Sequence, residues 1–335
     1  MPSPTTKRVF VTRPIAEIAL RRLAETARVE LWDDDMAPPH DELVTRLAQA
    51  DAVISMVADR FDAATIAKLP RLAVISNLAV GLDNIDLAAA TRAGIAVGHT
   101  PAVLAETTAD LAFALLMAVA RRVAEGDRYV RADRWHAWTP RLMLGRDVWG
   151  ATLGIIGWGA IGQAVARRAT GFGMRILYAA HQSSRGASVH QATPQAEEVE
   201  LPRLLAEADF ISINVPLTDQ TRHMIGAHEI AAMKREAIII NTARGPVIDE
   251  EALIVALRSG RIAGAGLDVT ELEPIRADHP LLQFPHVIVT PHIGSASHAT
   301  RIRMAELAVD NVLEVFAGRL PRCCANPSVV LRATS

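Results

Sequence analysis

The sequence has only two cysteines among its 335 residues, and Cys323 and Cys324 stand next to each other near the C-terminus. Two adjacent cysteines cannot form a disulfide framework, so we expect a reducing compartment. An excess of charge of one sign is also missing, because 35 basic and 37 acidic residues leave a net charge of −2. This balance favours neither nucleic acid nor an anionic membrane as a partner.

Long apolar runs are scarce as well. No apolar segment of the signal-peptide type precedes the first strand-like run. Residues 148–166 lack charge over nearly the length of a membrane span, but their grouped glycines are typical of a phosphate-binding turn. We find no internal repeat, no low-complexity tract and no indication of a metal site. The sequence therefore predicts a cytoplasmic chain without a membrane segment.

Short apolar runs alternate with helical patterns in the first hundred residues. Half of the chain is apolar and 21% is charged, which is globular composition, and the length suffices for two domains. Arg8–Thr12 and Ala52–Val57 are strand candidates, and Ile15–Ala27 has helical spacing. This alternation predicts βαβ units and hence an α/β fold with a parallel sheet.

A second alternation begins at Ala151, where six strand candidates follow one another and predict a second doubly wound sheet. Before it, residues 101–122 have the period of one long helix with a proline at its start, and residues 121–146 are predicted to form an irregular basic loop. Too few residues follow the second sheet to form a domain alone. We therefore expect residues 1–99 and 293–335 to form one discontinuous domain and residues 100–292 the other.

Residues 157–162 form a GxGxxG pattern that follows an apolar strand and opens a helical run. In this context Gly157 permits a tight turn, Gly159 lets the backbone approach a pyrophosphate, and Gly162 lets the helix pack closely on the strand. The helix N-terminus adds N–H donors and a partial positive charge. The pattern predicts dinucleotide binding, with a glycine-rich turn that binds nothing as the alternative.

The strand after the glycine turn leads to Ala180, where an NAD-selective site has an acidic residue for the ribose 2′-OH. Side chains that can donate to a 2′-phosphate follow instead: His181, Gln182, Ser183, Ser184 and Arg185. The sequence therefore predicts that NADP(H) is preferred and that NAD(H) is possible. The alternative is a polar surface loop that does not discriminate between the coenzymes.

Polar residues also stand where three later strands end, at the edge that binds ligands in such sheets. Arg244 follows one strand, Glu273 comes shortly after the next, and His292 follows the last. Together they indicate an acid–base site with an anion clamp. Taken singly, the arginine could equally be a salt-bridge partner and the histidine a strand cap.

At these residues the sequence resembles the D-2-hydroxyacid dehydrogenase family, from residues 77–86 to residues 294–297. Residues 100–110, 135–140 and 278–282 are most similar to the glyoxylate/hydroxypyruvate reductase branch. The resemblance implies a flavodoxin-like substrate domain, a Rossmann coenzyme domain and a cleft between them. It also implies NAD(P)H-dependent reduction of a small 2-ketoacid to the D-2-hydroxyacid, by a homodimer joined mainly through the coenzyme domains.

The resemblance further implies a role for each matched residue. Arg244 would hold the substrate carboxylate and polarise the keto oxygen, because its planar fork meets two oxygens at once. His292 would donate the proton, and Glu273 would bond the other imidazole nitrogen and keep the ring protonated near neutral pH. Val80 and Gly81 would offer backbone N–H groups to the carboxylate.

The coenzyme site implied by the glycine turn and the resemblance includes the donors after Ala180 and residues from several strand ends. These are Thr108, Gly157, Trp158, Gly159, Ala160, Ile161, Gly162, Ala180, Val215, Pro216, Thr221, Thr242, Ala243, Asp268, His292 and Gly294. His181 departs from the family, because many glyoxylate reductases have an arginine there. Other 2-ketoacids, such as 2-ketogluconate or phenylpyruvate, and a non-enzymatic corepressor-like scaffold that senses NAD(H) remain as alternatives.

Overall fold

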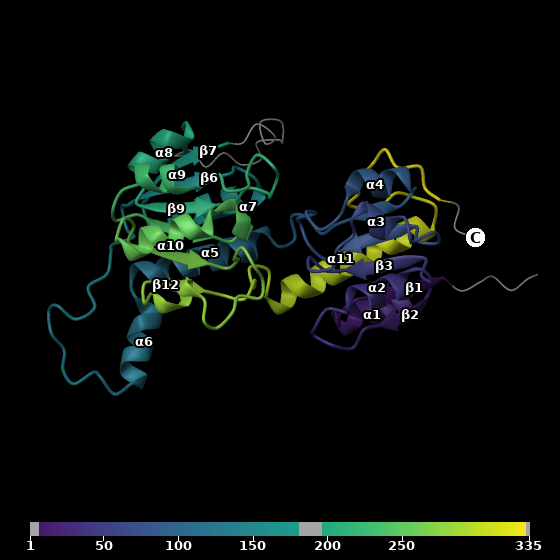
Figure 1. Ribbon diagram of the computed structural model, residues 1–335, viewed down its shortest axis with the longest axis horizontal. Helices are drawn as coiled ribbons and strands as arrows, with labels where there is room; N and C mark the ends of the chain where they lie inside the picture. The colour runs from purple at the N-terminus through teal and green to yellow at the C-terminus, as the bar shows by residue number, and fades with distance from the viewer. Residues whose placement is uncertain (1–6, 181–195, 333–335) are drawn as a thin grey trace, which may run out of the picture. The chain divides into compact units, whose positions relative to one another are not determined.

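The computed structural model describes residues 7–180 and 196–332, and the chain divides into two compact units (Figure 1). Unit 1 comprises residues 1–104 and 296–335, and unit 2 comprises residues 105–295. The chain thus leaves unit 1 once and returns to it. The predicted 2′-phosphate donors from His181 to Arg185 lie outside the described residues. Within the described part, no helix is both long enough and apolar enough to cross a bilayer.

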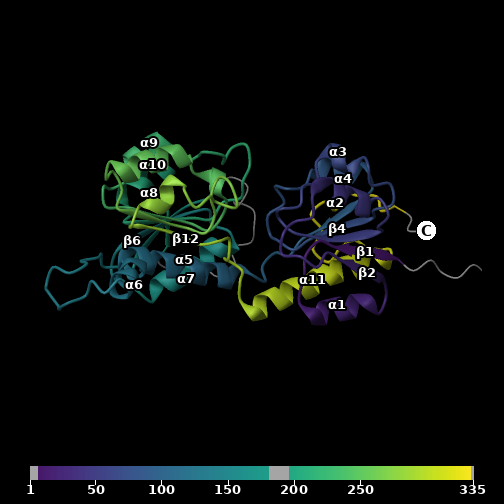
Figure 2. The same ribbon diagram turned by 60° about the horizontal axis from the view of Figure 1, so that its bottom comes forward.

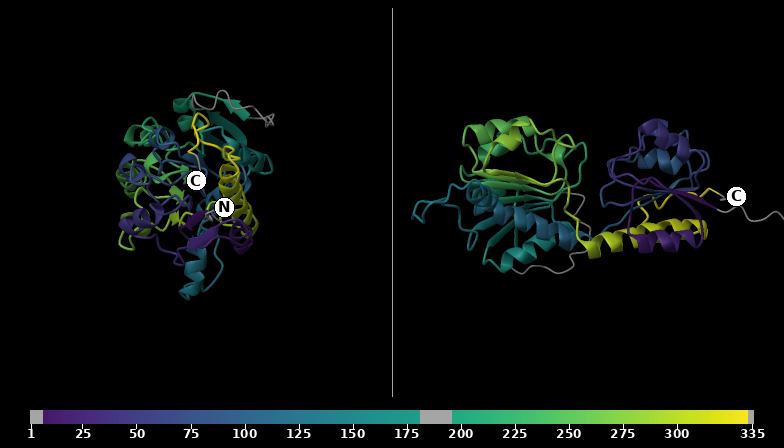
Figure 3. Two further views of the ribbon diagram at one scale, coloured as in Figure 1. Left: turned by 90° about the vertical axis from the view of Figure 1, so that its right-hand side faces the viewer. Right: turned by 90° about the horizontal axis from the view of Figure 1, so that it is seen from below.

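Unit 1 contains a five-stranded parallel sheet in the order β2-β1-β3-β4-β5, which is the flavodoxin-like order. Its strands are β1 (Arg8–Val11), β2 (Arg28–Leu31), β3 (Ala52–Ser55), β4 (Val74–Asn77) and β5 (Ala96–Gly98). Its helices are α1 (Glu17–Ala24), α2 (His40–Leu47), α3 (Ala63–Ile66), α4 (Leu87–Arg92) and α11 (His298–Phe316). The two sheet faces are both covered by helices, as the right-hand view of Figure 3 shows.

The sequence explains these elements locally. All four residues of β3 and of β4 are buried, as expected for central strands covered on both faces. The short helices α3 and α4 each begin at an aspartate, Asp62 or Asp86, whose carboxylate accepts a backbone N–H at 2.9 or 2.8 Å. Helix α11, from the far end of the chain, packs against α1, β3 and β4.

Unit 2 contains a seven-stranded parallel sheet in the order β12-β11-β10-β9-β6-β7-β8. Counted from β6, this is the Rossmann order 3-2-1-4-5-6 with one further strand. The strands are β6 (Thr152–Ile156), β7 (Arg175–Ala179), β8 (Ala196–Glu198), β9 (Phe210–Ile213), β10 (Ile238–Asn241), β11 (Gly264–Leu267) and β12 (Val287–Val289). Two doubly wound parallel sheets, as predicted, are confirmed.

Helices cover both faces of the unit 2 sheet, and each face has its own apolar core (Figure 2). One face is covered by α5 (Ala105–Ala120) and α7 (Ala160–Thr170). The opposite face is covered by α8 (Leu201–Glu207), α9 (Ala227–Ala232) and α10 (Glu250–Arg258). The remaining helical elements are α6 (Val123–Arg131), η2 (Gly245–Val247) and η3 (Pro280–Gln283).

Three expectations about these elements are wrong. The helix predicted for residues 101–122 begins only at Ala105, because Ala102 has a φ of 67° and the chain turns there, and it ends at Ala120. The predicted irregular loop of residues 121–146 contains α6, which projects from unit 2 (Figure 1). The predicted sheet of six strands has a seventh, β8, which pairs with β7.

Candidate functional site

The glycine turn joins β6 to α7 and is closely packed at two of its three glycines. Gly157 has a φ of 95°, and a Cβ there would lie 2.6 Å from the Asn214 carbonyl oxygen. A Cβ on Gly162 would lie 2.2 Å from the Gly157 oxygen. The space above Gly159 is open, since a Cβ there would meet no described atom within 4 Å. The turn therefore leaves room at the position where a pyrophosphate would approach the backbone.

Two buried oxygens near the same sheet edge lack a partner among the described residues. They are Asn214 Oδ1, after β9, and Thr242 Oγ1, after β10. Buried polar atoms are rarely left without a hydrogen-bond partner. Two such oxygens at one sheet edge therefore indicate a polar ligand. Together with the open space above Gly159 and the N-terminus of α7, these oxygens fit a dinucleotide.

Strand β7 leads to the position where an acid would bind the ribose, and its Tyr178 belongs to an aromatic pair. Trp158 of the glycine turn stacks on Tyr178, with ring centroids 3.9 Å apart and planes 17° apart. The Tyr178 hydroxyl donates to Glu198 of β8 at 3.3 Å, and burial, reinforced by this carboxylate, raises the pKa of Tyr178. Sequence reasoning missed this carboxylate, because β8 was not expected. Ala180 follows β7 and adds no charge.

The segment after β9 is held by Thr221, which is buried. Its hydroxyl donates to the Pro216 carbonyl at 2.6 Å and accepts the Thr218 N–H at 2.8 Å. Val215 is buried beside it. Val215 and Pro216, which are predicted to belong to the coenzyme site, therefore lie in a closed loop at the carboxyl end of β9.

The loop after β10 carries Arg244 and is fixed by the buried Asn241. The Asn241 amide donates to the Arg244 carbonyl at 2.9 Å and accepts the Ala243 N–H at 3.0 Å. Arg244 Nη1 donates to the Ala243 carbonyl at 2.8 Å. A Cβ on Gly245 would lie 1.9 Å from the Thr270 oxygen, so the loops after β10 and β11 touch through their backbones.

Glu273 and His292 are in direct contact. Glu273 Oε2 lies 2.7 Å from His292 Nδ1, and Glu273 Oε1 accepts the Thr270 N–H at 3.3 Å. Both side chains are about one third exposed, at 39% and 35%. His292 has a φ of 54°, a conformation that residues other than glycine seldom adopt.

Asp268, which is buried at the end of β11, organises the loop that carries His292. Its Oδ1 accepts the Thr290 hydroxyl at 2.6 Å and the Ile293 N–H at 2.8 Å, and its Oδ2 accepts the Gly294 N–H at 2.7 Å. The His292 N–H donates to the Asp268 carbonyl at 2.9 Å. A Cβ on Gly294 would lie 3.5 Å from the Thr108 hydroxyl, so Thr108 also belongs to this cluster.

The predicted site residues of unit 2 thus come together at the carboxyl ends of its strands. Arg244 follows β10, Glu273 follows β11, and His292 follows β12. Because all these strands are parallel, their ends meet at the sheet edge that also carries the glycine turn. Val80 and Gly81 belong to unit 1, in the turn after β4.

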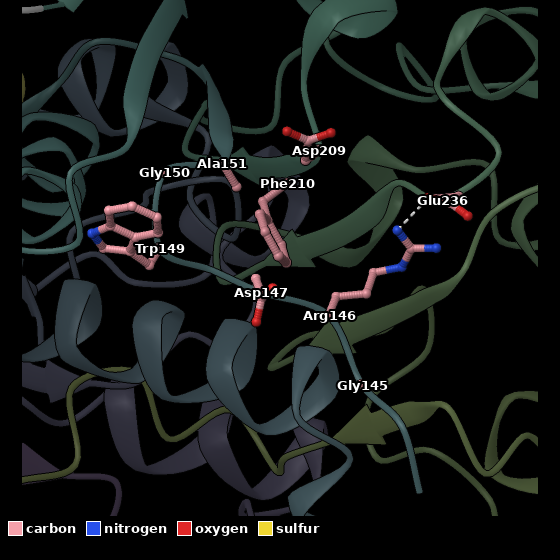
Figure 4. A pocket seen from close by; sticks show the side chains of 9 residues that line it. All are labelled: Gly145, Arg146, Asp147, Trp149, Gly150, Ala151, Asp209, Phe210 and Glu236. Carbon is pink, nitrogen blue, oxygen red and sulfur yellow. Dashed lines mark hydrogen bonds and ion pairs between the residues drawn. The ribbon is translucent and has the colours of Figure 1, made fainter. Parts of the chain in front are cut away.

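A cavity of about 450 Å³ in unit 2 lies at the opposite sheet edge (Figure 4). Residues at the amino ends of β6 and β9 line it, among them Asp209 and Phe210. Two ion pairs lie at this cavity, between Arg146 and Glu236 at 2.5 Å and between Asp209 and Lys234 at 2.7 Å. Since ligands of doubly wound sheets bind at the carboxyl ends, this cavity does not belong to the candidate site.

Comparisons with known proteins agree with this geometry. The family model described as D-isomer specific 2-hydroxyacid dehydrogenase, NAD binding domain, matches residues 113–294. A glyoxylate reductase of Korarchaeum cryptofilum is 51% identical over 324 residues, which cover 96% of this chain and 97% of that protein.

Two solved structures are also similar to this chain. A protein from Thermus thermophilus has a TM-score of 0.88 and 47% identity, over 95% of this chain and 99% of that one. The NADPH-dependent glyoxylate/hydroxypyruvate reductase of Sinorhizobium meliloti, solved with NADP and malonate, has a TM-score of 0.84 and 30% identity. That likeness covers 98% of this chain and 100% of the other.

Proposed function

The chain belongs to the D-isomer specific 2-hydroxyacid dehydrogenase family, and we propose that it reduces glyoxylate or hydroxypyruvate to the corresponding hydroxyacid. Where a stereocentre forms, the product has the D configuration. The proposal depends above all on the 2.7 Å contact between Glu273 and His292, beside the loop that carries Arg244. Relatives named glyoxylate reductase support the choice of a short 2-ketoacid.

His292 is the proton donor in this proposal. An ionised carboxylate can only accept, so the hydrogen of the contact with Glu273 lies on His292 Nδ1. The second ring nitrogen, Nε2, is then the one that gives its proton to the keto oxygen. The contact with Glu273 thus fixes the tautomer and the orientation of the ring. Asp268 holds the loop that carries the histidine in place.

Arg244 holds the substrate in this proposal. Its planar guanidinium can contact a carboxylate oxygen and the keto oxygen together, which binds the substrate and stabilises the charge that develops on the keto oxygen. The backbone N–H groups of Val80 and Gly81 bind the same carboxylate. A bound dihydronicotinamide coenzyme supplies the hydride.

The coenzyme is proposed to be NADPH in preference to NADH. Ala180 follows β7 without a carboxylate, so the ribose 2′-OH has no acidic acceptor there and a 2′-phosphate meets no repulsion. A relative solved with NADP supports this choice.

A substrate panel with both coenzymes tests the proposed function. Glyoxylate, hydroxypyruvate, pyruvate, 2-ketogluconate and phenylpyruvate are offered with NADPH or NADH, and coenzyme oxidation is followed by absorbance. We expect the highest kcat/KM for glyoxylate or hydroxypyruvate with NADPH. A higher value for 2-ketogluconate or phenylpyruvate would assign another substrate, and no oxidation with any ketoacid would favour the scaffold alternative.

A homodimer is proposed as the working form, joined through unit 2. Helix α6 buries none of its residues within the chain and projects from unit 2 (Figure 1). Large apolar side chains are exposed on it and on the segment that follows: Val123, Val130, Trp135, Trp138, Leu144 and Trp149. Exposed apolar groups gathered on one projection are typical of an interface between subunits.

A further inference from the structure

Three consecutive carbonyls of the turn after β4 are each bound by a different donor. The Ala79 oxygen accepts the Thr100 N–H at 2.8 Å, and the Val80 oxygen lies 3.0 Å from His99 Nδ1. The Gly81 oxygen accepts the side-chain amide of Asn77 at 3.1 Å. The peptide planes on both sides of Val80 are therefore fixed from their oxygen ends.

Fixed oxygens determine where the N–H groups of the same peptides point. In a trans peptide the C=O and N–H bonds lie on opposite sides of the chain. The Val80 and Gly81 N–H groups thus point away from the segment after β5 that binds their oxygens. Within the described residues neither N–H donates to a protein acceptor. Two successive N–H groups that point to the same side can bind one anion together, and we call this pair the nest.

His99 acts on this nest through one peptide bond. A carbonyl oxygen can only accept, so the hydrogen of the contact lies on His99 Nδ1. The Val80 oxygen and the Gly81 N–H belong to the same peptide group, and a donor on the oxygen polarises the N–H at its other end. The imidazole therefore both orients the Gly81 N–H and makes it a stronger donor.

The histidine is itself firmly held. The His99 N–H donates to the Cys323 carbonyl at 3.1 Å, and the His99 carbonyl accepts the Asn311 amide at 3.0 Å. Both partners belong to the C-terminal part of unit 1. The ring thus stands on a fixed backbone, whereas its own side chain is half-buried and makes a single contact with the turn.

We propose that His99 is a positioning residue for the substrate carboxylate, because its Nδ1–H orients and polarises the peptide whose Gly81 N–H binds that carboxylate. The proposal rests on the proposed function, in which Val80 and Gly81 bind the ketoacid. His99 touches neither substrate nor coenzyme in this role. Asn77 supports the turn from the other side, but it is fully buried, so its substitution would mainly test folding.

The experiment compares His99→Leu with His99→Asn, because the asparagine amide nitrogen occupies the place of Nδ1 on the side chain. We expect His99→Leu to raise KM for glyoxylate about 3–10-fold, because the lost contact stabilises the bound ground state and the transition state equally. The kcat and the KM for NADPH should stay nearly unchanged. His99→Asn should restore KM to within about twofold of the wild-type value.

His40→Leu is the matched control, since His40 also contributes one side-chain contact within unit 1, to Thr65 at 3.2 Å. It should lower Tm without changing KM. An unchanged KM in His99→Leu, or a KM that His99→Asn does not restore, would overturn the proposal.

If the wild type reduces no ketoacid, the proposed function fails instead, and calorimetry with oxalate in the presence of NADP⁺ still tests the nest. Oxalate affinity should then fall about 3–10-fold in His99→Leu, and an equal affinity would refute the role of His99.

Discussion

His292, the proposed proton donor, is the single residue whose replacement tests the reaction most directly. We expect His292→Ala to lower kcat for glyoxylate about 10²–10⁴-fold, the usual contribution of a positioned general acid. Coenzyme affinity, measured by fluorescence titration with NADPH, should persist, because the glycine turn belongs to β6 and α7. Turnover close to that of the wild type would remove His292 from its proposed role.

Arg244 is proposed to need its forked shape and not only its charge. Arg244→Lys keeps the charge, but a point charge cannot meet two oxygens in one plane. We expect kcat/KM for glyoxylate to fall roughly 10–150-fold, with KM raised and kcat lowered, since one charge-assisted hydrogen bond is lost. Arg235→Lys, on an exposed arginine of the same unit, is the matched control. An unchanged KM would assign the carboxylate to another residue.

Ala180 is proposed to favour NADPH through the absence of an acid. Ala180→Asp introduces an acceptor for the ribose 2′-OH and a repulsion for the 2′-phosphate. We expect the ratio of kcat/KM for NADPH over NADH to fall roughly 10–100-fold, mainly through weaker NADPH binding. The ratio is measured at a fixed, saturating glyoxylate concentration. A wild type that prefers NADH, or an aspartate variant with the same ratio, would contradict this interpretation of β7.

Some contacts of the candidate site could be anticipated from single residues and others could not. Apolar runs mark where strands end, so the sequence could place Arg244, Glu273 and His292 at one sheet edge. It could not predict that Asp268 binds three donors of the loop after β12, because hydrogen bonds between distant loops leave no periodic pattern. His292 lies in the same loop, and its positive φ likewise leaves no pattern in the sequence.

At the scale of secondary-structure elements, the sequence did not predict α6 or β8, and these two share one property. Helix α6 has no buried residue and lies in a basic stretch that the sequence predicts as an irregular loop, and ion pairs such as Arg131–Asp127 support it. Strand β8 has three residues, two of them glutamates, at the edge of the sheet. Neither element contributes a buried side chain to a core, unlike the central strands and the helices that cover the sheets.

The start of β12 is expected to make stability depend on pH. His286 precedes this strand, and burial lowers its pKa; the neighbouring Glu125 opposes this shift and Arg122 adds to it. The unfolded chain therefore takes up the proton first as the pH falls below about 6.5, and stability is lost in that range. In His286→Gln, Tm should fall less between pH 7.5 and pH 5.5 than in the wild type. Equal losses in both proteins would exclude this role.

At the scale of the whole molecule, α6 offers a test of the proposed dimer. Val130 is 53% exposed on this helix, and a charge there would be desolvated on association. We expect Val130→Glu to weaken the dimer at least about tenfold, measured by light scattering over a dilution series. Ile18→Glu, at a similarly exposed apolar residue of α1, should leave the mass unchanged. A wild type that is monomeric at all concentrations would refute the dimer.

The fold as a whole was more predictable than its separate pieces. Alternating strands and helices are compatible with few topologies, because crossovers between parallel strands are right-handed and short. The flavodoxin-like and Rossmann strand orders therefore follow even though helix ends and one edge strand were wrong. Helix ends depend on local events such as the positive φ of Ala102, which composition does not encode.

The return of the chain to unit 1 has a consequence for biosynthesis. In the sheet of unit 1, β4 is bound by the Ser76 hydroxyl to the Ala308 carbonyl of α11 at 2.8 Å, and β5 is bound at Val97 by the Asn326 side chain at 2.8 Å. Both partners are synthesised after unit 2, which is continuous in sequence. The N-terminal segment is thus made before unit 2 but completed after it, and the part of its sheet that α11 covers stays exposed while unit 2 is synthesised.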